Sequence, residues 1–169
     1  MINLKNFERN ATYLFNIMRK IGIDLNYIEI KTSFEKRLYI QKLVYMLKLH
    51  PDFKKYLNFA KYNMYFYGPY SPELAHIYYN LPRNIPEIEI AISNEALEYA
   101  KEIVEMEIED LEIAATLVEM WRERGEIAED VLIRLVYRLK FYLRRSENDV
   151  ANIFNKIKNL SKKYRLQIT

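Results

Sequence analysis

The sequence predicts a mainly α-helical fold: a single domain, residues 1–169, that contains one small two-stranded β element. Three observations predict this class. Only 3 glycines and 5 prolines occur, whereas residues that favour helices are plentiful. Half of the residues are hydrophobic, which is enough to bury a core in one domain. Apolar residues recur at helical spacing over most of the chain, and no internal repeat or flexible linker divides it.

The first third of the chain is expected to contain three helices, because apolar residues repeat there at helical spacing. Gly22 ends the first helix, a capping box between Thr32 and Glu35 opens the second, and Asp52 caps the third. The second helix is apolar on nearly every side, so we expect it in the centre of the core. The expected elements are a helix 4–21, an extended segment 24–30, a long helix 33–49 and a short helix 53–60.

Residues 65–74 (YFYGPYSPEL) organise the centre of the chain. Their aromatic run is typical of a short extended segment. Gly68 and Pro69 then break it, because Pro69 fixes its own φ and moves the preceding residue away from the helical region. Ser71 caps the helix that follows, 71–81, with a proline in its first turn. The stretch is therefore predicted to be extended chain, a rigid elbow and a helix start.

The remaining elements are one strand and four helices. Residues 87–92 largely alternate between apolar and polar, as a half-buried strand does, and residues 63–67 are their expected partner. The order of helix 71–81, this strand and another helix resembles that of a winged helix. We therefore expect the N-terminal half to be winged-helix-like. Four apolar seams predict the later helices, over about 93–108, 111–124, 131–142 and 150–164.

Composition bounds the environment of the protein. Without cysteine the chain has no disulfide, no thiol nucleophile and no cysteine-ligated zinc. The N-terminal residues lack the charged-then-apolar pattern of a signal peptide, and no apolar run is long enough to cross a bilayer. We therefore expect a soluble, cytoplasmic protein without membrane association.

Charge is distributed in three blocks. Residues 1–84 carry 13 basic and 6 acidic side chains, residues 85–130 carry 3 and 15, and residues 131–169 carry 10 and 2. Such blocks bind one another within a fold or face different partners. The interpretation we favour is that the acidic middle packs beside the two basic ends.

No catalytic centre is predicted. The two histidines, His50 and His76, lack a third convergent metal ligand, and we expect His50 at a helix C-terminus. Ser71 has no identifiable base, and there is no glycine-rich phosphate loop. Glu105, Glu109 and neighbouring carboxylates are expected on a solvated face. We therefore predict no enzyme activity, no metal and no cofactor.

Gln41 and Lys42 lie on the long helix before the aromatic stretch. Gln41 shares a stripe with apolar residues, and a buried amide must be hydrogen-bonded. It could form the polar wall of a pocket beneath the elbow, or act as a strut that binds the backbone near Gly68; we favour the strut. Lys42 is expected to extend along apolar surface with its ammonium group in water. Tyr45 and Tyr67 are expected to be mostly buried.

Nucleic-acid binding is an alternative function. The C-terminal block interleaves basic and aromatic residues, and Arg134 and Arg138 share a helix face that could contact phosphates. The acidic block next to it could neutralise that face. The candidate contacts are Arg134, Arg138, Arg144 and Arg145.

Two linked motifs carry a family resemblance: residues 37–45 (RLYIQKLVY) followed by residues 66–74 (FYGPYSPEL). Together they resemble the Panacea family, which includes SocA-like antitoxins and YwgA-like proteins. One departure is Ile40, where the family has leucine. The resemblance covers about residues 33–100; the helical C-terminal part, about 109–166, carries no motif of the family. The matching positions, and hence the implied partner-binding residues, are Gln41, Lys42, Tyr45, Tyr67, Gly68, Pro69, Tyr70 and Ser71.

The resemblance implies a mainly helical protein that acts by directly binding a protein partner. A toxin-like protein is the kind of partner that it suggests. A nucleic-acid-binding regulator is the alternative, and self-association into a homodimer is a further expectation. Residues 67–70 are expected chiefly to determine the fold, with an exposed rim that contributes to partner binding; Tyr70 lies either on that rim or in the core.

Overall fold

The computed structural model describes residues 4–168, apart from the side chains of Tyr27 and Ile28. Within this range the chain forms nine α-helices, one short 3-10 helix and one β-hairpin. In chain order these are α1 Leu4–Lys20, α2 Tyr27–Thr32, α3 Phe34–Leu47, α4 Pro51–Leu57, β1 Asn63–Tyr65, β2 Gly68–Tyr70, α5 Pro72–Tyr79, α6 Asn94–Val104, α7 Ile108–Arg124, α8 Glu129–Leu139, η1 Phe141–Leu143 and α9 Glu147–Tyr164.

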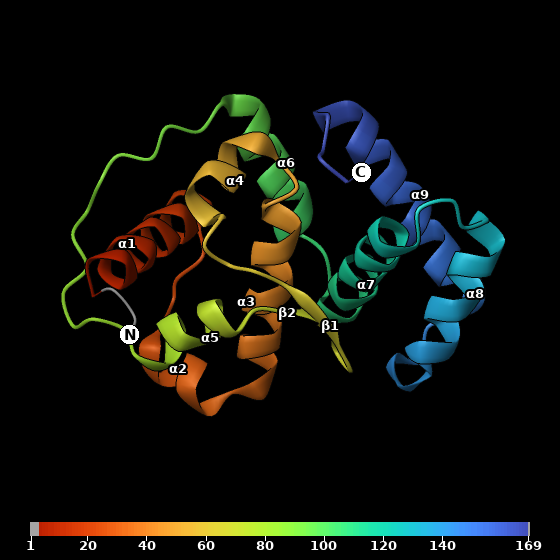
Figure 1. Cartoon of the computed structure of the whole chain (residues 1–169), viewed down its shortest axis with the longest axis horizontal. Coiled ribbons are helices and arrows are strands. Elements are labelled where there is room, and N and C mark those ends of the chain that lie inside the picture. Colours follow the sequence, from red (N-terminus) through yellow and green to blue (C-terminus); the bar gives the residue numbers. More distant parts are fainter. Residues whose placement is uncertain (1–3, 169) are drawn as a thin grey trace.

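Helix α3 lies in the middle of the molecule, with α1, α2, α4 and α5 on one side and α7, α8 and α9 on the other (Figure 1). It packs against α7 and β2, and its residues from Ile40 to Leu47 are all buried. Helix α7 is the second central element, because its ten residues from Leu111 to Met120 are buried as well. The predicted central position of the long helix is therefore confirmed, and the mainly helical class with it.

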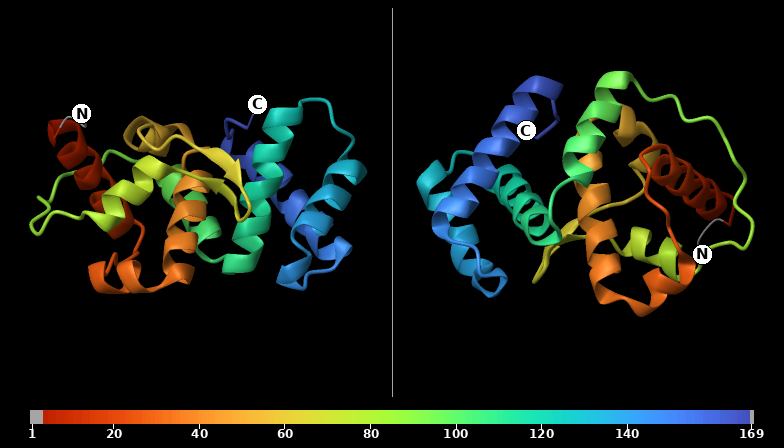
Figure 2. Two further views of the ribbon diagram at one scale, coloured as in Figure 1. Left: turned by 60° about the horizontal axis from the view of Figure 1, so that its bottom comes forward. Right: turned by 180° about the vertical axis from the view of Figure 1, so that it is seen from behind.

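The small sheet is a hairpin, and the predicted pairing of 63–67 with 87–92 is wrong. Strands β1 and β2 pair antiparallel, with Asn63 opposite Tyr70 and Tyr65 opposite Gly68. Residues 87–92 form no strand. They belong to the long connection between α5 and α6, which runs around the outside of the molecule past α1 (Figure 2).

Side chains take the place of a strand partner for this connection. Asn16 of α1 donates to the carbonyl of Pro86 (2.9 Å) and accepts from the N–H of Ile88 (3.0 Å). Three further side chains bind its backbone: Lys20 at Ile90, Tyr56 at Ala91 and Asp52 at Ser93. These bonds satisfy an extended backbone without a β-ladder.

The segment predicted as extended at 24–30 contains a helix, α2. The N–H of Glu29 donates to Oδ1 of Asn26 (3.4 Å), and Arg37 of α3 donates to the last carbonyls, those of Ile30 and Lys31. A helix this short depends on tertiary contacts, here with α3 and α5. A helix of six residues is too short for its apolar residues to show a helical repeat in the sequence, so α2 was not predicted.

Capping residues set several helix starts, two of them as predicted. Ser71 accepts from the N–H of Leu74 and Ser93 from that of Ala96. The cap of α3 is Ser33 rather than Thr32. His50 is the N-cap of α4, where its Nδ1 accepts from the N–H of Asp52 (3.2 Å), and burial lowers its pKa. The prediction that His50 acts as a cation at a helix C-terminus is therefore wrong.

Ion pairs join the acidic middle of the chain to its basic C-terminal end, as the preferred interpretation of the charge blocks expects. They comprise Arg145 with Glu107, Glu109 and Asp110, Lys158 with Glu129, Lys163 with Glu102 and Lys140 with Glu112. Across residues 4–168 no helix has the length and apolar character that crossing a membrane requires.

Candidate binding surface at the central hairpin

The hairpin turns at Phe66 and Tyr67, and Gly68 makes the turn tight. Neither turn residue has a positive φ, so the left-handed conformation falls on Gly68, with a φ of 88°. A Cβ atom at this position would lie 2.6 Å from Oγ1 of Thr116 on α7. Glycine is therefore needed here for its conformation and for the close approach of β2 to α7.

Gln41 anchors the chain just after β2, which confirms the strut interpretation. Its amide nitrogen donates to the carbonyl of Ser71 and its amide oxygen accepts from the N–H of the same residue, both at 2.9 Å. The nitrogen also lies 3.3 Å from the hydroxyl of Tyr78. The strut binds Ser71 rather than the expected backbone near Gly68, and it fixes the start of α5 against α3.

Lys42 does not extend into water as expected, because it is only 1% exposed. Its Nζ donates to the carbonyl of Pro69 at 2.6 Å. Burial lowers the pKa of Lys42 to about 7; the charge of Glu112 acts in the opposite direction and that of Lys140 in the same one. The amine satisfies a buried carbonyl of the hairpin, which an apolar side chain could not do.

A second lysine, Lys140, holds the turn from the other side. Its Nζ donates to the carbonyl of Phe66 (2.9 Å) and pairs with Oε1 of Glu112 (2.8 Å). The hydroxyl of Tyr142 also donates to that carboxylate. Glu112, expected on a solvated face, is 1% exposed. Lys42 of α3 and Lys140, which directly follows α8, thus fix the hairpin carbonyls of Pro69 and Phe66.

Exposed aromatic rings cover the outer side of this anchored hairpin. Phe66 is 71% exposed and Tyr67 41%, so the predicted burial of Tyr67 is wrong, whereas Tyr45 is buried as predicted. The ring of Tyr67 packs edge-on against Phe34 with centroids 5.1 Å apart, and that of Phe66 stacks on Tyr142 at 5.5 Å. We call the set the aromatic surface: Phe34, Tyr65, Phe66, Tyr67, Tyr79, Phe141 and Tyr142.

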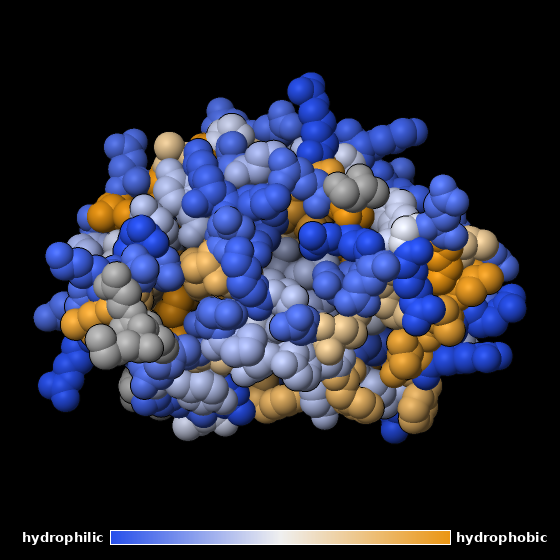
Figure 3. Space-filling view, in the orientation of Figure 1, coloured by the Kyte–Doolittle hydropathy of each residue, from blue (hydrophilic) through white to orange (hydrophobic). Residues whose placement is uncertain are grey.

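Hydrophobic side chains also lie beyond the hairpin. Figure 3 shows them over α8 and along the lower edge of that view. On α8, Val131 and Leu139 are exposed, and Phe141 of η1 follows directly. The aromatic surface thus continues from the hairpin toward an apolar end of α8.

A pocket of about 350 Å³ opens beside the aromatic surface, between α3, the hairpin and α5. Its wall contains five tyrosines, and Gln41 and Lys42 lie among its lining residues, so Gln41 is both strut and pocket wall. Tyr70 is half-buried, between the rim and core alternatives, and packs against Tyr65 with centroids 5.6 Å apart. Arg37 lies over the ring of Tyr79 at 5.6 Å. The lining is aromatic and basic, without an acidic residue among its described members.

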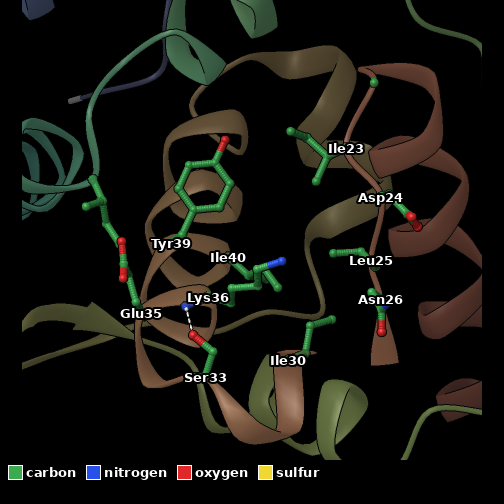
Figure 4. A pocket seen from close by; sticks show the side chains of 12 residues that line it. Ile23, Asp24, Leu25, Asn26, Ile30, Ser33, Glu35, Lys36, Tyr39 and Ile40 are labelled. Carbon is green, nitrogen blue, oxygen red and sulfur yellow. Dashed lines mark hydrogen bonds between the residues drawn. The ribbon is translucent and has the colours of Figure 1, made fainter. Parts of the chain in front are cut away.

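A separate hollow of about 420 Å³ lies between the α1–α2 connection and α3 (Figure 4). Ile23, Leu25 and Ile30 point into it from one side, opposite Tyr39 and Ile40 of α3. The marked hydrogen bond there, from the N–H of Lys36 to Oγ of Ser33, is the helix cap.

The candidate nucleic-acid residues do not form one free basic face. Arg145 pairs with Asp110 (2.8 Å) and Glu107 (2.5 Å), and these carboxylates raise its pKa. Arg134 lies 4.0 Å from Glu147. Arg138 and Arg144 are exposed, and Arg144 has a φ of 55° where η1 ends.

The motif positions divide between two sides of α3. Gln41 and Lys42 bind the hairpin segment, whereas the hydroxyl of Tyr45 donates to Glu119 on α7 and its ring packs on Tyr62. Within residues 4–168 no three metal-ligating side chains are grouped so as to hold a metal ion. The arrangement therefore presents a rigid aromatic surface over a buried polar cluster.

Sequence reasoning did not identify Glu112, Thr116 and Lys140 as parts of this site. A signal was present for the first two, because they interrupt an otherwise apolar run on α7. Comparison of the chain with protein-family models, with curated proteins and with solved structures gave no match.

Proposed function

We propose that this protein binds another protein directly through its aromatic surface, in a role like that of the Panacea antitoxins. The observation that carries the proposal is the exposure of Phe66 and Tyr67 at the tip of a hairpin fixed by two buried lysines. Aromatic residues are enriched among the residues that dominate binding energy at interfaces. The proposal includes membership of the Panacea family and a winged-helix-like N-terminal half.

Rigidity supports the proposal energetically. A surface that is already ordered loses little conformational entropy on binding, so more of its contact energy appears as affinity. The backbone of the turn is held through Phe66, Pro69 and Ser71, while the rings above it face solvent. The anchors and the exposed rings therefore serve separable roles, stability and recognition.

A photo-crosslinking amino acid in place of Phe66 tests the proposal in cells that produce the full chain. Its matched control carries the same group at exposed Lys101 on α6. The product of a gene beside this one, in particular a toxin-like protein, is the first partner to test with purified components. We expect Phe66→Ser and Tyr67→Ser to weaken that complex about tenfold or more and to leave the melting temperature unchanged.

Equal affinities for the wild type and both variants would contradict the proposal. Crosslinks from position 66 only to a second copy of the chain would replace it with a homodimer interface. Sedimentation at several concentrations would distinguish that outcome.

A nucleic-acid-binding regulator is the second candidate, supported by the exposed side chains of Arg138 and Arg144. Affinity for DNA or RNA should then fall steeply with salt, and Arg138→Ala should weaken binding to all sequences alike. We expect only weak, salt-sensitive binding. Tight, sequence-selective binding at physiological salt would favour this candidate over a protein partner.

A further inference from the structure

A basic hollow lies on another part of the molecule, where the end of α3 meets α4 and α7. Its volume is about 290 Å³. Four basic side chains line it: Lys48 directly after α3, Lys54 on α4, Lys61 before β1 and Arg122 on α7. The fold therefore brings together cations that are up to 74 residues apart in the chain.

These cations are close enough to repel one another. The pKa of Lys48 is lowered to about 8, first by burial and then by the charges of Lys61, Arg122 and Lys54, while Glu119 acts in the opposite direction. Glu119 is the one acid among the described lining residues. It is nearly buried, accepts from the hydroxyl of Tyr45 and lies 3.8 Å from Arg122. The hollow thus keeps an excess of positive charge.

Most of the basic side chains in this hollow lack the acidic partners that pair with the basic side chains of the C-terminal block. Lys54 donates to the side-chain oxygen of Gln167 (2.8 Å) and Lys48 to the carbonyl of Ala60, both uncharged acceptors. Lys61 has no hydrogen-bond or ion-pair partner among the described residues. Arg122 forms an ion pair with Glu119 and also contacts the hydroxyl of Tyr45. Lys54, Lys61 and Arg122 are exposed at the rim, so an anion can reach them.

We infer that this hollow binds a phosphate group, as free phosphate or as the phosphomonoester of a small molecule. Three exposed cations around one half-buried lysine suit a compact anion with several oxygen acceptors. The side-chain amides of Asn58 and Gln167 and the ring of Tyr62 line the same space and offer polar and apolar contacts to an organic part. The inference does not depend on the proposed protein partner.

Isothermal titration of the full chain with inorganic phosphate and with glycerol phosphate, at constant ionic strength, tests the inference. We expect saturable binding of one equivalent. Loss of one charge-assisted contact in Lys61→Gln or Arg122→Gln should weaken it about tenfold. Lys101→Gln, which removes an exposed charge on α6, is the control and should leave it unchanged. Tighter binding of the ester identifies a phosphomonoester as the ligand, and equal affinities identify phosphate itself.

A second readout locates the anion, with sulfate as a probe that does not titrate near neutral pH. An anion beside Lys48 raises the pKa of that lysine, so binding near pH 8 should take up protons, and affinity should fall as the pH rises above 8. The charged and titratable groups facing Lys48 are Lys54, Lys61, Arg122, Glu119 and Tyr62. Proton uptake should disappear in Lys48→Met.

Three results would overturn the inference. The first is the absence of saturable phosphate or sulfate binding at millimolar concentrations. The second is binding that Lys101→Gln weakens as much as Lys61→Gln does. The third is binding of oligonucleotides that depends on Lys61 and Arg122 while neither small anion binds, which would reassign the hollow to a nucleic-acid backbone.

Discussion

Gly68 is the residue at which two requirements of the hairpin meet. Its positive φ disfavours any side chain, and its missing Cβ leaves room for Thr116. Gly68→Ala should lower the free energy of unfolding by about 1 kcal/mol for the conformation and by about 1–3 kcal/mol more for the clash. Urea unfolding measures the change.

Gly22→Ala is the matched control for that substitution. Gly22 has a similar φ of 81°, but a Cβ there would meet no atom within 4 Å. Only the conformational cost of about 1 kcal/mol should appear. Equal losses in the two variants would show that contact with Thr116 does not matter.

Lys42 should make stability depend on pH, because its pKa is about 7 in the folded chain and 10.5 in the unfolded chain. Between these values the unfolded chain binds more protons, so the contribution of Lys42 to the free energy of unfolding rises with pH. Below pH 7 both states are protonated and the cost of burying the charge is fully present. Lys42→Met should flatten the dependence between pH 7 and 9.5, as urea unfolding would measure. A parallel pH profile in the variant would contradict the lowered pKa.

At the scale of elements, the connection between α5 and α6 depends on side chains of α1 and α4 for its hydrogen bonds. Asn16 is the main tether, because it binds Pro86 and Ile88 and is only 5% exposed. Asn16→Ala should leave both backbone groups unpaired and cost about 1–3 kcal/mol. Limited proteolysis should then cut within residues 82–92 sooner than in the wild type.

Asn6→Ala, at an exposed position on the same helix, is the control and should change neither stability nor cleavage. An unchanged cleavage rate in Asn16→Ala would show that the remaining bonds from Lys20, Tyr56 and Asp52 hold the connection without it.

Across the whole molecule, ion pairs link the acidic middle of the chain to its C-terminal block. Arg145 carries three of them, to Glu107, Glu109 and Asp110, with a partly exposed side chain. Arg145→Gln should lower the free energy of unfolding by about 0.5–1 kcal/mol at low salt and by less at high salt, because salt screens exposed pairs. Arg144→Gln, at an exposed neighbour, should have no comparable effect. A loss of stability independent of salt would assign Arg145 a packing role instead.

Much of the fold follows from local sequence signals. Periodic apolar residues predict most of the long helices, and Ser71 and Ser93 predict helix starts, because a cap is a contact within three residues. The elbow predicted at Gly68 and Pro69 is wrong in its place, because these residues begin β2 and the turn lies at Phe66 and Tyr67. The amide of Gln41 among apolar neighbours does predict a buried hydrogen bond.

Tertiary structure alone decided which segments meet and which charges are buried. Nothing local distinguishes 68–70 from 87–92 as the partner of β1; the tether at Asn16 and the close approach of Gly68 to α7 decide it. Lys140 and Glu112 can both be buried because they pair with each other, and Lys140 also donates to the turn carbonyl of Phe66, 74 residues away. Lys48, Lys61 and Arg122 likewise form a basic hollow only once α3, α4 and α7 are packed. The physical reason is that helix formation and capping depend on residues a few positions apart, whereas burial and electrostatics depend on distances that the folded chain sets.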